Sequence, residues 1–401
     1  MTGSESSEKK LNIMFASHTY IGGPFVVGSH HLAREFAQLG HRVMHVSTSI
    51  TPLHLLQLRQ PTVLSRFRQW LNIKKQEGPV INCVPFSWIP WQIAGRWFRK
   101  SRNNWFVRFT AFPKLSKLLD FHRFTEIDLL LIDQPVFAGI QHYLKAKVIL
   151  YRPTDIYKDM QGDRTVEAAE RDIVSQVHGV VATSDPVYQN IRKWNPELPG
   201  MVMENGVEFS HFSNPGDEPE ELIGIPRPRA IYIGAVDSRL DLEAIKSLAE
   251  ARRDLSIVII GPRPRFALPS FGSNVYLLGA KPYSRLPAFL HQSDLALLPL
   301  SGHAANAGRS PMKLYEYAAA GLPTVVTATP ELLRRDEHFL YFYKDKQEFI
   351  DQVNHLLEQL NRNEISKAEI VEAASKQSWE TKAEQMLVFG LNLIERVHLS
   401  D

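Results

Sequence analysis

The chain has 401 residues, of which 44% are hydrophobic and 22% charged, and its formal net charge is +3 at neutral pH. This composition is typical of a globular protein that is long enough for two hydrophobic cores, and it excludes a disordered or fibrous chain. No apolar run approaches the roughly 18 residues of a membrane-spanning helix. Residues 1–10 are polar and lack the apolar core of a signal peptide, so we expect a disordered tail and no export.

Cys83 is the single cysteine of the chain. One thiol permits neither an internal disulfide nor a cysteine-based metal cluster, which suits a reducing compartment. We expect Cys83 to be a small buried residue rather than a nucleophile.

Short apolar runs separated by helical patterns fill the first half of the chain. Alternating strands and helices favour a parallel, doubly wound sheet. The helical pattern over 28–40 is an example of the segments between the strands. The predicted strands are 11–17, 41–47, 127–133, 147–153 and 179–184.

Residues 53–119 form a basic and aromatic stretch. It contains twelve Lys or Arg against one acid, Glu77, and five of the seven tryptophans, whereas the rest of the chain is acidic on balance. Cations interleaved with Trp and Phe are typical of a segment in a membrane interface, and Arg96, Arg99, Lys100 and Arg102 lie at its centre. A solvated basic insertion with buried aromatics and a nucleic-acid site are the alternatives, but no nucleic-acid-binding motif is present.

Asp155 follows the predicted strand 147–153 and therefore lies at the sheet edge where doubly wound proteins place their ligands. A carboxylate there can take the proton from an attacking hydroxyl group. Alternatively, Thr154 or Asp155 caps the next segment, or Asp155 pairs with Arg152. Two weaker candidates lie farther from the strand end, at Asp159 and Asp163.

The second half repeats the pattern of strands and helices after an Asn-Gly turn in the segment 203–212. A region near 204–228 is poor in core-forming residues and is the expected linker. The predicted strands are 229–235, 255–260, 274–278, 294–300 and 323–328. A second parallel sheet is therefore expected, followed by one long amphipathic helix over 379–397.

The segment 310–325, SPMKLYEYAAAGLPTV, joins a Pro-Met-Lys turn to a helix and then to an apolar strand. The free N–H groups at a helix start favour an anion, and Lys313 beside Met312 adds a positive charge. Glu316, one turn later, can accept hydrogen bonds from ribose hydroxyl groups. The segment thus predicts a site for a nucleoside diphosphate, although an ordinary amphipathic helix between two strands has the same residue types.

No metal site is visible in the sequence, which lacks HExxH and a DxD pair at a plausible strand end. A leaving diphosphate must then be neutralised by cations, with Lys313 first and Arg239 second. Arg239 has an alternative role as a solvated helix residue. The histidines near the first strand-to-helix turn are expected to be structural, with contact to a sugar or a lipid phosphate as the alternative: His18, His30 and His31.

Three segments in order, 203–212, 257–300 and 310–323, resemble the hinge and nucleotide-binding half of GT-B glycosyltransferases. Segments 23–54 and 151–157 resemble the membrane-associated, GumK-like glucuronosyltransferases of xanthan assembly. The resemblance implies an α/β GT-B fold of two Rossmann-like, doubly wound domains facing a cleft, with a C-terminal helix that crosses back to the first domain. It implies these domains: acceptor-binding 11–204, nucleotide-sugar-binding 205–378 and the helix 379–401.

The family's activity is the inverting transfer of glucuronate from UDP-glucuronate to a polyprenyl-diphosphate-linked oligosaccharide in exopolysaccharide assembly. The resemblance places the catalytic base at Asp155 and the protein on the cytoplasmic face of the inner membrane, as a peripheral protein without a metal, cofactor or nucleic acid.

One position departs from the wider GT-B pattern. Gly308 stands where many retaining relatives carry a second glutamate, which favours an inverting reaction. Its neighbours His303, Asn306 and Arg309 would then face the donor sugar, and Arg309 is a candidate partner for a glucuronate carboxylate. A different UDP-sugar donor, a UDP-sugar epimerase and a catalytically silent GT-B partner protein remain as alternatives.

Overall fold

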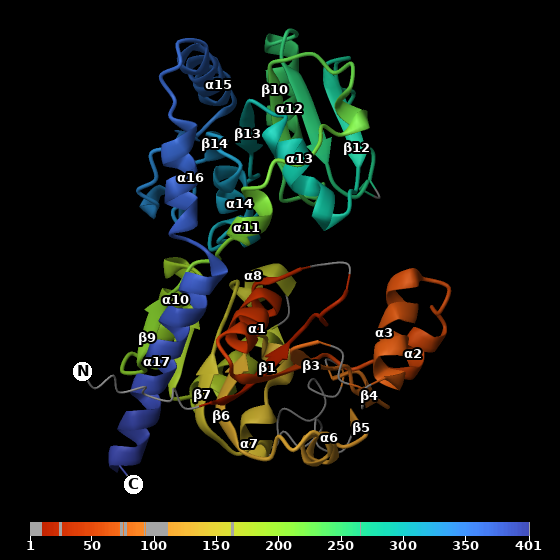
Figure 1. The fold of residues 1–401 in the computed structure, drawn as a ribbon, viewed down its shortest axis with the longest axis vertical. Coiled ribbons are helices and arrows are strands. Elements are labelled where there is room, and N and C mark those ends of the chain that lie inside the picture. The colour runs from red at the N-terminus through yellow and green to blue at the C-terminus, as the bar shows by residue number, and fades with distance from the viewer. Residues whose placement is uncertain are drawn as a thin grey trace, which may run out of the picture. The chain divides into compact units, whose positions relative to one another are not determined.

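The structure, a computed structural model, describes residues 10–23, 26–72, 75, 78–91, 93, 111–161, 164–264 and 266–400. The chain divides into two compact units: Met1–Glu204 together with Lys382–Asp401, and Asn205–Thr381. Each unit has a parallel sheet flanked by helices, as Figure 1 shows.

The sheet of the first unit has seven parallel strands in the order β3-β2-β1-β6-β7-β8-β9. Its strands are β1 (Asn12–Ser17), β2 (Arg42–Ser47), β3 (Val80–Cys83), β6 (Ile127–Ile132), β7 (Ala146–Tyr151), β8 (Gly179–Ala182) and β9 (Gly200–Val202). The five predicted strands are confirmed, whereas the edge strands β3 and β9 were not predicted. Cys83 at the end of β3 is buried, as expected.

The helices around this sheet and in the segments beside it are mostly short. They are α1 (Gly28–Gln38), α2 (Pro52–Leu55), α3 (Pro61–Leu71), α6 (Leu115–Phe121), α7 (Ile140–Tyr143), α8 (Tyr157–Gln161), α9 (Arg164–Val174) and α10 (Asp185–Arg192).

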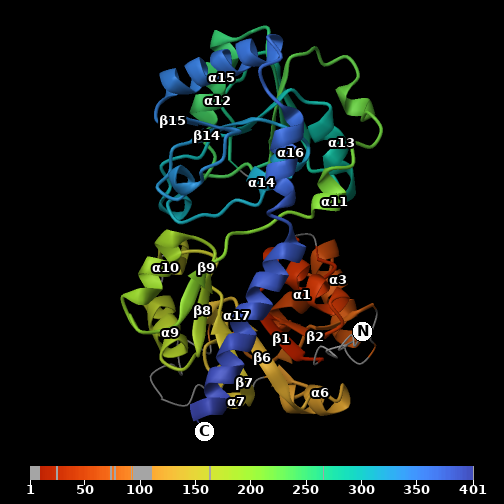
Figure 2. The ribbon, with the colours of Figure 1, turned by 60° about the vertical axis from the view of Figure 1, so that its left-hand side comes forward.

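The C-terminal helix α17 (Trp379–Ser400) lies against the sheet of the first unit (Figure 2). A Cβ atom added to Gly390 would lie 3.2 Å from the side chain of Leu129 in β6. A Cβ atom added to Gly179, at the start of β8, would lie 2.9 Å from the side chain of Leu393 in α17. The helix therefore returns to the first unit, which confirms the crossing expected from the GT-B resemblance.

The sheet of the second unit has six parallel strands in the order β12-β11-β10-β13-β14-β15. Its strands are β10 (Arg229–Ile233), β11 (Ser256–Ile260), β12 (Val275–Gly279), β13 (Leu295–Leu298), β14 (Thr324–Thr327) and β15 (Leu340–Tyr343). Its helices are α11 (Phe209–Phe212), α12 (Leu242–Ala251), α13 (Leu286–His291), α14 (Lys313–Ala319), α15 (Lys346–Asn361) and α16 (Lys367–Ser375). The edge strand β15 was not predicted.

The expected linker near 204–228 is wrong beyond its first residue. Phe212 and Leu222 of this region are completely buried in the core of the second unit, and Ile225 packs with them. The acidic and proline-rich residues between them obscured these apolar anchors in the sequence.

The described parts of the basic and aromatic stretch contribute to the core as well as to the surface. Phe86 in β4 (Phe86–Ser87), which pairs with β5 (Ala111–Phe112), is buried, and so is Trp91. By contrast, Trp88 is 67% exposed. The cations at the centre of the predicted membrane segment, Arg96, Arg99, Lys100 and Arg102, lie outside the described residues.

Candidate functional site

Two glycines bring the backbone close together at the carboxyl edge of the second sheet. Gly234 follows β10 and Gly261 follows β11, and a Cβ added to Gly261 would lie 1.8 Å from the carbonyl oxygen of Gly234. The Cε atom of Lys313 lies 2.9 Å from the position of a Cβ on Gly234. The lysine side chain therefore lies against the end of β10, at the edge where parallel sheets bind ligands.

Glu316 lies behind Lys313 on α14 and is 94% buried, since its exposed fraction is 6%. No hydrogen bond to its carboxylate occurs among the described residues. Burial raises the pKa of Glu316, and the nearby charge of Glu208 raises it further. The positive charges of Lys313 and His211 act in the opposite direction. A buried carboxylate without a partner is well suited to accept hydrogen bonds from sugar hydroxyl groups.

The segment 203–212 positions this site. Asn205 donates from its backbone N–H to Ser310 Oγ over 3.2 Å and from its side-chain amide to the Ser310 carbonyl oxygen over 2.8 Å. These bonds hold the turn that leads into α14. His211 stacks on Tyr283 with 4.8 Å between ring centroids. Sequence reasoning identified this segment only as a hinge and missed the approach of His211 and Glu208 to Glu316.

Arg239 is not a helix residue, so that alternative is wrong. It lies in the turn before α12, where its Nη2 atom is 2.6 Å from Asp237 Oδ2. The ion pair lowers the pKa of Asp237, although burial opposes the shift. Because Asp237 already neutralises part of the Arg239 charge, Lys313 is the stronger candidate for a diphosphate.

The loop before α14 is only partly accessible. Met312 and Arg309 are half-buried, and the charge of Arg309 acts on both Tyr232 and Asp237.

Asn306 is buried and donates to the carbonyl oxygens of Arg239 and Ser301 over 2.9 Å each. Its Oδ1 atom has no described partner. The second unit thus brings Arg239, Asn306 and Arg309 to the same edge of the sheet.

Asp155 lies in the first unit, in the loop between β7 and α8, and is half-buried. Its Oδ2 atom accepts a hydrogen bond from Thr154 Oγ1 over 3.0 Å. Tyr157 braces this loop, because its hydroxyl group accepts from the Thr154 N–H and donates to the carbonyl oxygen of Asp133 over 2.6 Å. Of the weaker candidates, Asp159 is exposed in α8 and Asp163 lies outside the described residues.

A second carboxylate at this edge, Asp133, was not singled out from the sequence. Asp133 follows β6 directly and is buried. The distance between its Oδ2 atom and Arg152 Nη1 is 3.6 Å. Burial raises its pKa to about 6, while Arg152 and hydrogen bonds from Ser17 and Ser29 lower it. The signal was present in the sequence, since Asp133 ends an apolar strand just as Asp155 follows one.

The histidines near the first strand-to-helix turn differ in their surroundings. His30 and His31 are buried, whereas His18 is exposed. Burial lowers the pKa of His30 to about 4, so this ring is neutral at pH 7 and hydrogen-bonds to Thr19 Oγ1 over 2.9 Å. The structural role expected of these residues remains a prediction.

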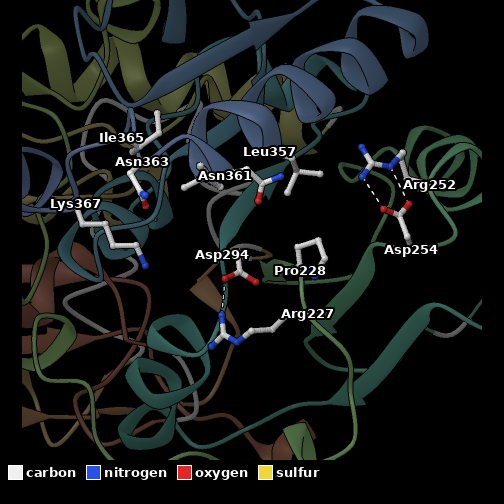
Figure 3. Close-up of a pocket in the computed structure, with 11 residues that line it drawn as sticks. Arg227, Pro228, Arg252, Asp254, Asp294, Leu357, Asn361, Asn363, Ile365 and Lys367 are labelled. Carbon is white, nitrogen blue, oxygen red and sulfur yellow. Dashed lines mark hydrogen bonds and ion pairs between the residues drawn. The ribbon is translucent and has the colours of Figure 1, made fainter.

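Charged side chains line a large pocket at the opposite edge of the second sheet, where the strands begin (Figure 3). Its volume is about 720 Å³. Its arginines are paired, Arg227 with Asp294 and Arg252 with Asp254. The pocket therefore offers no free arginine charge for a diphosphate.

Within the described residues, no cluster of His, Cys, Asp or Glu is arranged to hold a metal ion. In the same part of the chain, no helix is both long and apolar enough to cross a membrane.

Comparison with known proteins agrees with this architecture. Residues 227–359 match the family model of glycosyl transferases group 1. A Bacillus subtilis (strain 168) protein that carries the name of a teichuronic acid biosynthesis glycosyltransferase, TuaH, is 26% identical over 197 residues. That match covers 47% of this chain, and the chain spans about half the length (50%) of this curated relative.

Solved structures match over almost the whole chain. Sucrose-phosphate synthase from Thermosynechococcus elongatus has a TM-score of 0.70 at 13% identity, and the match covers 98% of this chain and all of that one. Anabaena HepE in complex with UDP-glucose has a TM-score of 0.64 at 15% identity, with 94% and 98% covered. The fold is therefore of the GT-B type, and the residues that match the group 1 glycosyl transferase model belong to the second unit.

Proposed function

We propose that the protein is an inverting glycosyltransferase that moves a sugar from a UDP-sugar to a lipid-linked acceptor in polysaccharide assembly. The observation that carries this proposal is the pair formed by Lys313 and the buried, unpartnered Glu316 beside Gly234. A cation and a carboxylate about one helical turn apart suit the diphosphate and the ribose of a nucleotide sugar. The HepE complexes with UDP and UDP-glucose support a nucleotide in this type of fold.

In the proposed reaction, the oxygen of the acceptor hydroxyl group forms a bond to the anomeric carbon of the donor sugar. Asp155 accepts the proton that this hydroxyl group loses. The bond between that carbon and the diphosphate breaks, and Lys313 stabilises the charge on the departing UDP. The preference for inversion rests on Gly308, which leaves the corresponding position without a carboxylate. GumK-like specificity for UDP-glucuronate is the most specific form of the proposal, with Arg309 as the partner of the sugar carboxylate.

A peripheral location at the cytoplasmic face of the membrane is part of the proposal. Large exposed apolar side chains are concentrated in and beside the basic and aromatic stretch, including Leu56 at 85% and Trp88 at 67% exposure. Such side chains beside cations suit insertion at lipid headgroup level. Attachment by this surface would bring the protein to a lipid-linked acceptor.

A panel of radiolabelled UDP-sugars, each incubated with the protein and a membrane lipid extract, tests the proposal. Label from one donor, expected to be UDP-glucuronate, should enter the lipid phase, and the new linkage should have the opposite anomeric configuration. Conversion of the donor into an epimeric UDP-sugar, with no label in the lipid phase, would support the epimerase alternative. Absence of both transfer and UDP binding would contradict the proposal.

A further inference from the structure

A second pocket, of about 280 Å³, lies in the first unit between the loop after β1 and the helices α2 and α3. These two helices lie beside each other in Figure 1. The lining residues are His18, Thr19, Tyr20, Gly23, His54, Gln57, Thr62, Val63 and Arg66. None of these nine carries a carboxylate, and Glu35 is the single acid between residues 11 and 76 of the sequence.

Arg66 supplies the permanent positive charge of this pocket. Its Nη2 atom donates to the carbonyl oxygen and to Oγ1 of Thr48, the latter over 2.6 Å, and its guanidinium lies 5.7 Å from the ring centroid of Tyr20. Its Nε atom is buried without a described partner. Within the described part of the chain, no carboxylate lies within ion-pairing distance of Arg66. A partly buried guanidinium that has only neutral partners favours an anionic ligand.

Two histidines add hydrogen-bond donors. His54 Nδ1 accepts from the Thr51 N–H over 3.1 Å, so its Nε2 carries the proton and is available as a donor. His18 is exposed at the rim, and its ring has no hydrogen-bond partner among the described residues. Desolvation and the charge of Arg66 lower the pKa of both rings. A bound anion would reverse the effect of Arg66 on them.

Exposed apolar side chains adjoin the lining residues His54 and Gln57 in the chain. His54 and Gln57 line the pocket from α2 and the turn that follows, while the leucines between and beside them face solvent. These exposed leucines are Leu53, Leu55, Leu56 and Leu58. A cationic pocket with exposed leucines next to its lining residues suits a ligand that joins an anionic group to a hydrocarbon chain.

We propose that this pocket binds the phosphate group of the lipid-linked acceptor, with the start of the lipid chain on the leucines of α2 and its following turn. Arg66 would pair with the phosphate, and His18 and His54 would donate hydrogen bonds to it. The proposal rests on the proposed function for the identity of the acceptor, but phosphate binding can be measured without transfer.

Calorimetry with three probes tests the pocket: hexyl phosphate, hexanol and inorganic phosphate. Saturating UDP is included in order to occupy the donor site. Hexyl phosphate should bind at least about tenfold more tightly than inorganic phosphate, because burial of two methylene groups is sufficient for that difference. Hexanol should show no saturable binding. Equal binding of hexanol and hexyl phosphate, or no binding of either, would overturn the proposal.

Variants locate the bound phosphate. Arg66→Gln should weaken hexyl phosphate binding about tenfold or more, since it removes a charged hydrogen-bond donor. Arg68→Gln is the matched control, because Arg68 is exposed on the same helix and does not line the pocket. If Arg66→Gln does not fold, His18→Gln at the exposed rim replaces it, with an expected loss of about threefold. Unchanged affinity in the folded variant would contradict the assignment.

Further readouts separate this inference from its alternatives. The ring signals of His18 and His54 should shift in NMR spectra on addition of hexyl phosphate, and Arg66→Gln should raise the KM for the lipid acceptor while the KM for the donor stays unchanged. Normal UDP binding without hexyl phosphate binding would overturn the pocket alone, whereas the reverse result would overturn the proposed function alone. Loss of binding to phosphatidylglycerol vesicles in Arg66→Gln, with hexyl phosphate binding retained, would assign the pocket to bilayer headgroups instead.

Discussion

Arg152 and Asp133 form an ion pair in the interior of the first unit, although each directly follows a different, neighbouring strand. The distance between Arg152 Nη1 and Asp133 Oδ2 is 3.6 Å, and both side chains are almost completely buried. Tyr157 connects the Asp133 backbone to the loop that carries Asp155. Tyr157 thereby connects the strand end that carries the ion pair to the loop of the proposed catalytic base, Asp155.

The buried Asp133 should make stability depend on pH in a defined direction. Its pKa is raised to about 6 from 3.8, so the folded state binds a proton more strongly than the unfolded state does. The contribution of Asp133 to the free energy of unfolding is therefore largest below about pH 3.8 and falls as the pH rises toward about 6. Asp133→Asn should flatten this slope, measured as the urea midpoint from pH 4 to 7. An unchanged slope in the folded variant would contradict the raised pKa.

Asp155→Asn should abolish transfer and leave UDP binding intact, because the amide keeps the shape of the side chain but cannot accept the proton. The loss in turnover should be at least about 100-fold. Asp159→Asn is the control, since Asp159 is exposed in the neighbouring helix α8. Turnover above about a tenth of the wild-type value would remove Asp155 as the base.

Lys313→Ala should weaken the binding of UDP by about 1.5–3 kcal/mol, the value of a charge-assisted hydrogen bond. Calorimetry with UDP measures this change directly. Lys346→Ala at the exposed start of α15 is the control for loss of one positive charge from the same unit. Equal UDP affinity in the Lys313 variant and the wild type would show that the diphosphate lies elsewhere.

Much of the fold was predictable because the central strands are apolar runs with turn residues at both ends. The edge strands β3, β9 and β15 have only three or four residues and are only partly buried, so they lack the continuous apolar runs of the central strands. Phe212 and Leu222 were missed as core residues because isolated apolar residues among Pro, Asp and Glu resemble a linker.

Some residues of the candidate site could be found in the sequence, whereas others are visible only in three dimensions. Lys313 and Asp155 follow from strand ends and local motifs. The pairing of Arg239 with Asp237 and the approach of His211 to Glu316 depend on folded loops, so composition and spacing could not predict them. The pocket around Arg66 joins the separate segments 18–23 and 54–66 and was equally hidden.

The two glycines at the carboxyl edge of the second sheet, Gly234 and Gly261, should respond differently to a methyl group. Gly261→Ala places a Cβ 1.8 Å from a backbone oxygen and should destabilise the second unit by several kcal/mol, on the order of 4 or more. In Gly234→Ala the methyl group meets side-chain atoms of Tyr232 and Lys313 rather than the backbone. That variant should fold but bind UDP more weakly. Thermal unfolding and calorimetry measure both effects, and a stable Gly261 variant would contradict the close backbone approach.

Vesicle sedimentation tests the membrane surface. The protein should pellet with vesicles that contain phosphatidylglycerol or cardiolipin, and salt should release it, because attraction between surface charges is screened over about 8–10 Å at physiological ionic strength. Replacement of Arg96, Arg99, Lys100 and Arg102 by Gln should weaken binding and slow transfer to a long-chain acceptor while sparing a short soluble analogue.

The exposed apolar residues permit a sharper version of the same test. Leu56→Gln combined with Trp88→Gln should reduce pelleting without loss of thermal stability, since both side chains are largely exposed. Leu333→Gln is the matched control, because this leucine is 54% exposed but belongs to the second unit. Equal pelleting of the double variant and the control would show that residues 53–119 do not form the membrane surface. Loss of transfer to both the long-chain and the short acceptor in the quadruple variant would show the same. The cations of this stretch would then belong to the core or the sugar site, and the lipid-linked acceptor would have to be reached by another face of the protein.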